Sequence, residues 1–517
     1  MAIEKRLLSG DEAAALGAYE AGASMGFGYP GTPSTEILEA FATFKGVYAE
    51  WSINEKVALE AATGASLGGA RTLVTMKHVG LNVALDAFVT LAYTGINAGL
   101  VLAVADDPGM HSSQNEQDNR YIGKFSYAPV IEPSSPAEAR DFIKSAYELS
   151  ERFDLPVLFR ITTRVAHSRG SVAFDPSIPP AGGIKQMDVP WDKYVMMPLN
   201  AKKRRIVLVD KFNKLKDFAE TTGLNSVEMA DTDIGIITSG VAYEYVREVF
   251  PGKSILKLGL LNPLPAEKIR EFAAGVQKLY IVEELEPYIE EFVRAMGIAC
   301  TGKEIVPLID ELSPDILRDA FFGKKEDKKK PGVIAPGRPP QLCADCGHRG
   351  VFKVLSELKV TVAGDIGCYT LGALPPFSAM HTCIDMGGSI NHAYGMVKAG
   401  ADPSKVAAVI GDSTFMHSGI TGIANAVFNN GNMLTIILDN RTTAMTGRQT
   451  HPAAGKTLQG AAGHNIDILE LLKALGVAHT AVADPFEYRE FKPLVEKFLK
   501  LEGVRVIIAQ RPCALLK

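Results

Sequence analysis

Short runs of Val, Ile and Leu recur along the chain and alternate with longer stretches in which apolar residues have helical spacing. Continuous apolar runs predict strands buried on both faces, which is typical of parallel sheets covered by helices. The runs form three groups: 72–78, 100–107 and 156–164; 233–240 and 278–284; 360–367, 405–412, 433–440 and 504–510. The pattern therefore predicts an α/β fold with three parallel-sheet units.

Two stretches divide these groups. GSVAFDPSIPPAGG begins at residue 170 and is followed by the basic run AKKRR, and GKKEDKKKPGVIAPGRPP combines like charges with Pro and Gly. Such composition is typical of solvated connections. We predict domains at 1–195, 233–322 and 341–517, a connecting segment at 196–232 and a linker at 323–340.

The long apolar region at 82–107 could be taken for a membrane span. It carries Asp86 and Asn97, and it ends in the strand-like LVLAVADD. A transmembrane helix needs about 20 consecutive apolar residues. We therefore predict a buried helix followed by a buried strand, and no membrane.

The composition is that of an ordinary globular protein, with 47% hydrophobic residues and a net charge of −5 over 517 residues. A balance this mild argues against nucleic acid or an acidic membrane surface as the main partner. Six cysteines in so long a chain form no disulfide framework, and the first residues contain no apolar signal segment. We expect reduced thiols and a cytoplasmic location.

Cys343 and Cys346 lie two residues apart in QLCADCGHRG. Two thiols at this spacing could bind zinc, bind an iron–sulfur cluster, form a redox disulfide or be buried side chains. A zinc site would need a second pair nearby, and the remaining cysteines are single and far apart.

Polar residues follow two strands of the third group. Gly411 and Asp412 end the run KVAAVIGD, and Asn440 ends MLTIILDN, with a helix-length segment between them. Open α/β sheets bind ligands at the carboxyl ends of their strands, and oxygen donors suit Mg²⁺. The alternative is an ordinary strand–helix–strand turn.

A glycine pair lies ahead of another predicted helix in this unit. Gly387, Gly388 and Ser389 stand in CIDMGGSINHAYGM. Free N–H groups at a helix start bind phosphate, so this segment is a candidate diphosphate cradle, although the signal is weak alone.

In the first group, Glu55 lies in the first turn of an Ala- and Gly-rich helix within AEWSINEKVALEAATGASLGG. The plain alternative is an acidic residue that complements the helix dipole. GFGYPGTPSTEILEAF and DDPGMHSSQNEQDNRYIG are candidate substrate-contacting segments, or simply a capped helix and a surface loop.

Several motifs together carry a family resemblance: YPGTPST, NEKVALEAATGAS, HSSQNEQDNR, CADCGHR, GDIGCYTLG and GDSTFMHSGITG. In this order they resemble the 2-oxoacid:ferredoxin oxidoreductases, from about residue 7 to residue 515. The spacing from GD to DN is similar to the GDG…NN motif of thiamine diphosphate enzymes. Ser413 departs from the second glycine of that motif.

The resemblance implies a pyrimidine-binding domain, a transketolase C-terminal-like middle domain and a diphosphate-binding domain. It implies thiamine diphosphate with Mg²⁺. Residues expected at the metal and the diphosphate are Asp412, Asn440, the carbonyl of Thr442, Gly411, Ser413, Gly387, Gly388 and Ser389.

By matching positions, Glu55 is the glutamate that hydrogen-bonds the pyrimidine ring. Thr32 and Arg120 match positions that contact substrate in relatives, and a guanidinium pairs well with a carboxylate.

The resemblance also implies a [4Fe–4S] cluster held by Cys343, Cys346, Cys368 and Cys513. Cys300 and Cys383 have no matching position. Two competing hypotheses are a non-redox thiamine decarboxylase or carboligase with a zinc or purely structural thiol site, and a non-catalytic subunit.

The implied reaction converts a 2-oxoacid and coenzyme A to an acyl-CoA and CO₂, with electrons passed to ferredoxin. Aryl substrates such as indolepyruvate and phenylpyruvate are implied in the same way. A small beta subunit is expected as partner, in a hetero-oligomer of alpha–beta pairs. Relatives usually continue into a ferredoxin-like domain, which we expect to be missing here or to lie on another polypeptide.

Overall fold

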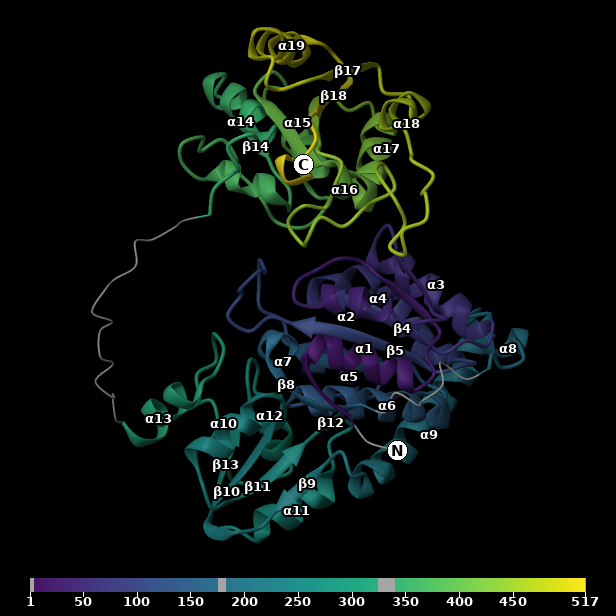
Figure 1. The fold of residues 1–517 in the computed structure, drawn as a ribbon, viewed down its shortest axis with the longest axis vertical. Helices are drawn as coiled ribbons and strands as arrows, with labels where there is room; N and C mark the ends of the chain where they lie inside the picture. The colour runs from purple at the N-terminus through teal and green to yellow at the C-terminus, as the bar shows by residue number, and fades with distance from the viewer. Residues whose placement is uncertain (1–3, 175–182, 324–339, 517) are drawn as a thin grey trace. The chain divides into compact units, whose positions relative to one another are not determined.

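The computed structural model describes residues 4–174, 183–323 and 340–516. The chain divides into two compact units, residues 1–330 and 331–517 (Figure 1). Nearly all of the predicted linker at 323–340 lies outside the described residues.

A seven-stranded sheet forms the centre of the N-terminal unit, in the order β12-β6-β7-β5-β4-β2-β3. All neighbouring strands are parallel except β12 and β6. The three strands predicted in the first group are confirmed as β4, β5 and β7, and each is buried along its whole length. The strands are β2 (Met25–Gly28), β3 (Tyr48–Trp51), β4 (Thr72–Lys77), β5 (Leu100–Asp106), β6 (Val130–Ile131), β7 (Val157–Thr162) and β12 (Leu260–Asn262).

Helices pack around this sheet, as Figure 1 shows for α1, α2 and α4. They are α1 (Gly10–Glu20), α2 (Thr35–Phe41), α3 (Glu55–Leu67), α4 (His78–Thr94), α5 (Asn119–Ser126), α6 (Pro136–Phe153) and α7 (Thr163–His167). The apolar region at 82–107 is confirmed as the buried face of α4 followed by β5. Among the described residues, no helix is both long and apolar enough to cross a bilayer.

A second sheet in the same unit has the order β13-β10-β11-β9, with β9 antiparallel to β11. Its strands are β9 (Ser226–Glu228), β10 (Asp231–Ser239), β11 (Lys253–Leu258) and β13 (Lys278–Val282). The strand β12, directly after β11, leaves this sheet and pairs with β6 of the first. Helices α10 (Ala242–Val249), α11 (Ala266–Ala274), α12 (Tyr288–Ala295) and α13 (Pro314–Phe322) complete this part.

The segment predicted as a connection at 196–232 contains a long helix, α9 (Pro198–Thr221). The basic run AKKRR lies on this helix, and Arg204 donates hydrogen bonds of 2.8 and 3.0 Å to the carbonyls of Tyr93 and Thr94 at the end of α4. Lys, Arg and Ala favour helices, so a charged run does not by itself indicate an extended chain.

The C-terminal unit contains one five-stranded parallel sheet in the order β14-β15-β16-β18-β17. All four predicted strands are confirmed, although the first is short. The strands are β14 (Thr361–Ala363), β15 (Val406–Gly411), β16 (Met433–Asp439), β17 (His479–Ala483) and β18 (Val504–Gln510). The helices are α14 (His348–Glu357), α15 (Ser389–Lys398), α17 (Ile420–Phe428), α18 (Ile468–Ala474) and α19 (Tyr488–Lys500).

Between β15 and α17 the chain forms α16 (Asp412–Thr414) and then the π-helical turn η2 (Phe415–Gly419). The remaining elements are β1 (Glu4–Ser9), β8 (Arg169–Phe174), α8 (Trp191–Tyr194), η1 (Cys368–Ala373) and η3 (Ala514–Leu516). The predicted α/β class with three mostly parallel sheets is therefore confirmed.

Candidate functional site

The carboxyl edge of the five-stranded sheet gathers most of the predicted site residues. Asp412 follows β15 and Asn440 follows β16, while Cys368 lies beyond β14 and Cys513 beyond β18. These four strands are neighbours in the sheet and all run parallel. Their carboxyl ends therefore meet at one edge, which is where such sheets bind ligands.

All four predicted cluster cysteines line one small cavity of about 80 Å³. Cys343 and Cys346 come from the turn before α14, where the Cys346 N–H donates to the Cys343 carbonyl at 3.1 Å. Cys368 begins η1, and Cys513 follows β18. Three segments far apart in sequence thus contribute thiols to the same space.

Cys343 is exposed, and the other three thiols are partly buried. Burial raises the pKa of Cys346 to about 11, and the other three cysteines contribute to this rise. Burial also raises the pKa of Cys368. A cation would be required to keep such thiols deprotonated. The donor set of four convergent sulfurs therefore fits a thiolate-bound metal centre.

The spacing of the sulfurs bears on which metal would fit. Four thiolates around one zinc at Zn–S distances of about 2.3 Å would lie about 3.8 Å apart. Among the described residues, these thiols do not form a group whose ligand atoms all approach within 4.8 Å of one another. Fe–S clusters are larger centres that are also held by four thiolates, so this donor set fits a cluster as well as a single metal ion.

His348, which a zinc site could also use, is the first residue of α14. Its ring is buried and packs edge-on against Tyr369, with ring centroids 5.8 Å apart. Burial lowers the pKa of His348 to about 4, and neither ring nitrogen has a hydrogen-bond partner among the described residues. The side chain borders the cysteine cavity as a neutral ring.

Asp412 is 2% exposed and already has backbone donors. Its Oδ1 accepts from the Ser413 N–H at 2.8 Å and its Oδ2 from the Arg441 N–H at 2.7 Å. His451 Nε2 lies 3.2 Å from Oδ2. A carboxylate oxygen accepts more than one bond, so the group still fits a hard divalent cation.

The second predicted magnesium ligand, Asn440, has its side-chain oxygen 3.1 Å from the Thr442 N–H, which donates to it. Asp439, one residue earlier, is a buried carboxyl that sequence reasoning did not single out. Burial raises the pKa of Asp439, and the neighbouring Asp412 raises it further. Two carboxyl groups this close fit the presence of a cation.

The candidate diphosphate cradle is partly occupied by a side chain. Gly387 and Ser389 donate their N–H groups to the carboxylate of Asp365, at 2.7 and 3.0 Å. The expected free N–H groups are therefore engaged at these two positions, and a phosphate would compete with Asp365. Ser389 is buried, and its side chain also interacts with the Asp365 carboxyl. The cradle stays a prediction.

At the carboxyl edge of the seven-stranded sheet, Glu55 is the first residue of α3. Asn54 caps this helix by accepting the Val57 N–H at 2.9 Å. Glu55 is 6% exposed and lies against Gly80 of α4, where an added Cβ would come within 2.6 Å of Glu55 Oε1. Only glycine at position 80 leaves room for this carboxylate.

Thr32 lies after β2 at a cavity of about 420 Å³ that Ser112 and Thr163 also line. Ser112 Oγ donates to the Thr32 carbonyl at 3.1 Å, and Lys77 Nζ donates to the Ser112 carbonyl at 2.6 Å. Burial lowers the pKa of Lys77 to about 8. Sequence reasoning missed Lys77, although a lysine that ends an apolar strand was a visible signal.

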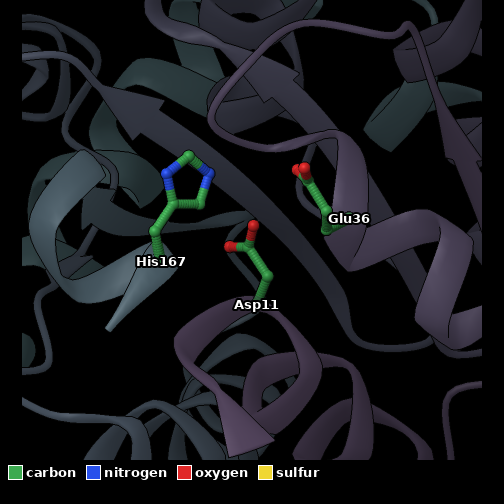
Figure 2. Close-up of side chains that lie close together, drawn as sticks. All are labelled: Asp11, Glu36 and His167. Atoms are coloured by element: carbon green, nitrogen blue, oxygen red, sulfur yellow. The ribbon is translucent and has the colours of Figure 1, made fainter. Parts of the chain in front are cut away.

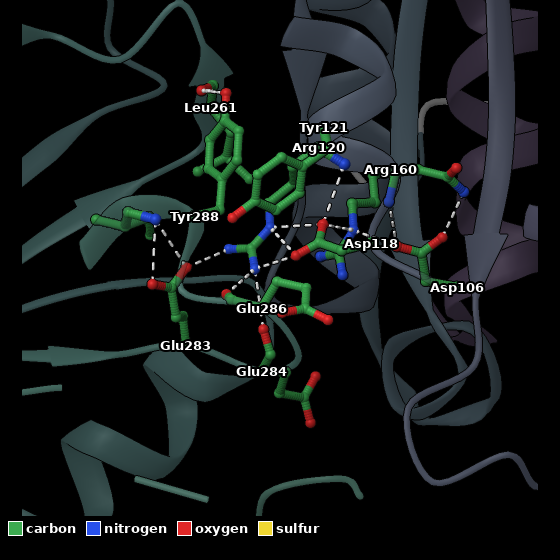
Figure 3. Close-up of polar contacts among 12 residues, drawn as sticks. Asp106, Asp118, Arg120, Tyr121, Arg160, Leu261, Glu283, Glu284, Glu286 and Tyr288 are labelled. Atoms are coloured by element: carbon green, nitrogen blue, oxygen red, sulfur yellow. Dashed lines mark hydrogen bonds and ion pairs between the residues drawn. The ribbon is translucent and has the colours of Figure 1, made fainter. Parts of the chain in front are cut away.

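Arg120, which is predicted to contact substrate, lies in a network of buried charges. Figure 3 shows its guanidinium surrounded by carboxylates and carbonyls from two parts of the N-terminal unit. Nε donates to Asp118 Oδ1 at 2.8 Å, and one terminal nitrogen donates to Glu283 Oε2 at 2.6 Å. The other terminal nitrogen donates to the carbonyls of Glu284 and Glu286. Arg120 is 1% exposed, so the structure gives it an ion-pairing role between α5 and the segment after β13.

Two families match the chain. The family described as "Thiamine pyrophosphate enzyme, C-terminal TPP binding domain" matches residues 365–509, and "Pyruvate flavodoxin/ferredoxin oxidoreductase, thiamine diP-bdg" matches residues 16–204. These ranges cover most of the five-stranded sheet, without β14, and most of the seven-stranded sheet, without β12. They support thiamine diphosphate binding.

Curated relatives match almost the whole chain. The indolepyruvate oxidoreductase subunit IorA of Pyrococcus abyssi is 41% identical, over 99% of this chain and 86% of that protein. The subunit of the same name from Archaeoglobus fulgidus is 39% identical, over 99% of this chain and 87% of that protein.

Among solved structures, a 2-oxoglutarate:ferredoxin oxidoreductase from Magnetococcus marinus aligns with a TM-score of 0.50 at 18% identity. The alignment covers 60% of this chain and 64% of that one. At this identity the likeness bears on the fold alone.

Proposed function

This chain belongs to the family of the indolepyruvate oxidoreductase subunit IorA, and from that premise we propose that it oxidises aryl 2-oxoacids with coenzyme A. The family places it among thiamine diphosphate-dependent 2-oxoacid oxidoreductases. The proposed reaction converts the 2-oxoacid anion and coenzyme A to an acyl-CoA, CO₂, one proton and two electrons. Indolepyruvate and phenylpyruvate are the proposed substrates.

The observation that carries the proposal is the convergence of four thiols at the sheet edge that also holds Asp412 and Asn440. A non-redox thiamine enzyme has no need of an electron exit. A two-electron oxidation does, and a [4Fe–4S] cluster held by Cys343, Cys346, Cys368 and Cys513 would supply it.

The chain's own residues have distinct proposed tasks. Bound thiamine diphosphate supplies the electron sink for decarboxylation. Asp412, Asn440 and the Thr442 carbonyl would hold Mg²⁺ and through it the diphosphate, with Gly411, Ser413 and the 387–389 segment beside them.

Glu55 would hydrogen-bond the pyrimidine ring and hold a proton there. Its burial and the space left by Gly80 support this role. Thr32 would contact the substrate from the rim of its cavity. A substrate role for Arg120 stays a prediction, and the ion pairs with Asp118 and Glu283 speak against it.

We also propose a pyrimidine-binding domain at 1–195, a transketolase C-terminal-like domain at 233–322 and a diphosphate-binding domain at 341–517. A small beta subunit would complete the enzyme in alpha–beta pairs, and ferredoxin would accept the electrons. The subunit naming of the relatives supports a partner chain.

The test is metal and sulfide analysis of protein purified anaerobically with its partner subunit. We expect about four iron atoms and matching acid-labile sulfide per chain. Cys300→Ser and Cys383→Ser serve as matched controls and should retain the iron, because neither residue lines the cysteine cavity. Zinc without iron would overturn the redox proposal in favour of a non-redox thiamine enzyme.

Assays with indolepyruvate, phenylpyruvate, pyruvate and 2-oxoglutarate would then test the substrate class. Reduction of ferredoxin that depends on coenzyme A and prefers the two aryl substrates is the expected result. A preference for pyruvate or 2-oxoglutarate would contradict the aryl assignment while leaving the reaction class intact.

A further inference from the structure

Three side chains with metal-ligating atoms converge in the N-terminal unit, and none of them has been assigned a role above. Asp11, Glu36 and His167 place one ligand atom each within 4.8 Å of one another. Figure 2 shows Asp11 pointing into the space between the His167 ring and the Glu36 carboxylate. They come from α1, α2 and α7, so the cluster joins three separate elements.

The local structure explains why these side chains meet. Ser9 and Glu12 form a capping box that fixes the first turn of α1, where Asp11 lies. Gly10 packs so closely on α7 that a Cβ there would collide with the Val165 carbonyl, which brings Asp11 next to His167.

The start of α2 is also held in place, because the Gly31 N–H donates to Thr35 Oγ1 at 3.0 Å. Glu36 follows Thr35 in this first turn. The helices α1 and α2 pack against each other, as do α1 and α7.

Asp11 provides the observation that points to a ligand. It is 0% exposed, and neither of its carboxylate oxygens has a hydrogen-bond partner among the described residues. A buried carboxyl without a partner is strongly unfavourable as an anion, and here Glu36 adds a second acidic group beside it. A bound cation would satisfy both carboxylates at once.

We propose that Asp11, Glu36 and His167 form a binding site for a divalent transition-metal cation such as Zn²⁺. Two carboxylate oxygens and one imidazole nitrogen suit zinc, whereas Mg²⁺ and Ca²⁺ take oxygen ligands. Three protein ligands leave at least one coordination position for water or another ligand.

The site has a structural consequence for the proposed substrate cavity. His167 also lines the cavity of about 420 Å³ that contains Thr32, and Glu36 lies in the first turn of the helix that follows the Thr32 turn. A cation held between them would tie the Thr32 turn to α7. We therefore expect the metal to stabilise this corner of the N-terminal unit.

The experiment uses the intact protein, with its partner subunit, thiamine diphosphate, Mg²⁺ and iron already bound. Equilibrium dialysis against Zn²⁺ should leave one zinc more per chain in the wild type than in Asp11→Asn or His167→Gln. Added Zn²⁺ should raise the melting temperature of the wild type and not of these variants. Glu39→Gln, on the same helix as Glu36, should behave as the wild type.

The alternative is that Asp11 is a buried acid that stays protonated without any metal. Equal zinc content in the wild type and Asp11→Asn, or a zinc-induced stabilisation that survives in His167→Gln, would overturn the proposal. Because zinc content and melting temperature are measured without turnover, the result is independent of the proposed oxidoreductase reaction.

Discussion

The two large sheets present different chemistry at the same kind of edge. At the carboxyl edge of the seven-stranded sheet, buried charges pair with one another. Arg160 pairs with Asp106 and Glu132, and Arg120 pairs with Asp118 and Glu283 (Figure 3). At the carboxyl edge of the five-stranded sheet, four free cysteines line one cavity, and Asp412 lies beside a second carboxyl.

The difference shows that residue type and strand-end position are not enough to assign a ligand. Arg120 has the right chemistry for a substrate carboxylate, yet its guanidinium is engaged within the protein. Burial raises the pKa of Cys346 and of Cys368, and the neighbouring cysteines raise both further. A polar group left unsatisfied by its own chain is the better indicator of an external ligand.

The largest expected effect comes from Cys346→Ala, which removes one thiolate from the five-stranded edge. We expect loss of most of the iron and loss of ferredoxin reduction, because a [4Fe–4S] cluster is held by four thiolates. Iron analysis and the visible absorption of the purified protein check this. Full iron content in Cys346→Ala would show that Cys346 is not a cluster ligand. It would also weaken the proposed difference between the carboxyl edges of the two large sheets.

Glu55→Gln tests the one residue of the seven-stranded edge that we assign to the cofactor. Loss of a general acid or base lowers turnover by about 100- to 10,000-fold. Retention of thiamine diphosphate and an unchanged melting temperature would show that the loss is chemical. Glu60→Gln is the matched control, since Glu60 lies on the same helix, is exposed and pairs with the exposed Lys56.

Arg120→Met tests whether the charges of the first edge serve the fold. Breaking a buried ion pair by removing one partner is destabilising by about 3–5 kcal/mol, because the other charges stay buried. We expect a melting temperature lower by several degrees, whereas Arg318→Met at an exposed pair should change little. A raised KM for the 2-oxoacid at unchanged stability would instead restore Arg120 as a substrate contact.

The smallest expected effect concerns Glu284, beside the Arg120 network. Burial raises the pKa of Glu284 to about 7, although the Leu312 N–H donates to its carboxylate. The carboxyl of a glutamate in an unfolded chain has a pKa of about 4.3. Between about pH 4.3 and about pH 7, the folded protein therefore holds a proton on Glu284 that the unfolded chain has lost. The contribution of Glu284 to the stability of the folded state is therefore fully present below about pH 4.3, and it is lost as the pH rises through 7.

Melting temperatures measured from pH 5 to pH 8 should show that decline in the wild type and a flatter profile in Glu284→Gln. The exposed Glu304→Gln should keep the wild-type profile. If the melting temperatures of the wild type and Glu284→Gln change with pH in the same way, the Glu284 carboxyl is ionised over this whole pH range, like the paired carboxylates beside it.

The sequence predicted the fold well because the decisive signals are local. Continuous apolar runs mark β4, β5, β7, β15, β16 and β18, and the parallel order of such strands places Asp412, Asn440 and Cys513 at one edge. The family resemblance predicted that Cys343, Cys346, Cys368 and Cys513 lie close together. The cavity that all four residues line agrees with this prediction.

The features that escaped prediction depend on contacts between distant segments. Arg120 meets Glu283 across 163 positions, and Asp11 meets His167 only because α1 packs on α7. The N–H groups of the 387–389 segment were expected to be free, and no local pattern indicated that Asp365 would occupy two of them.

The position of strand β12 limits where the chain can be truncated to give a stable fragment. It pairs with β6, and the Asn262 amide donates to the carbonyls of Gly123 and Ala128, so the second sheet covers an edge of the first. A recombinant fragment that stops at residue 195 would expose β6 as an open edge, which is a site for unwanted strand pairing. For expression or gene division, an N-terminal piece must therefore extend beyond β12 to keep this edge covered.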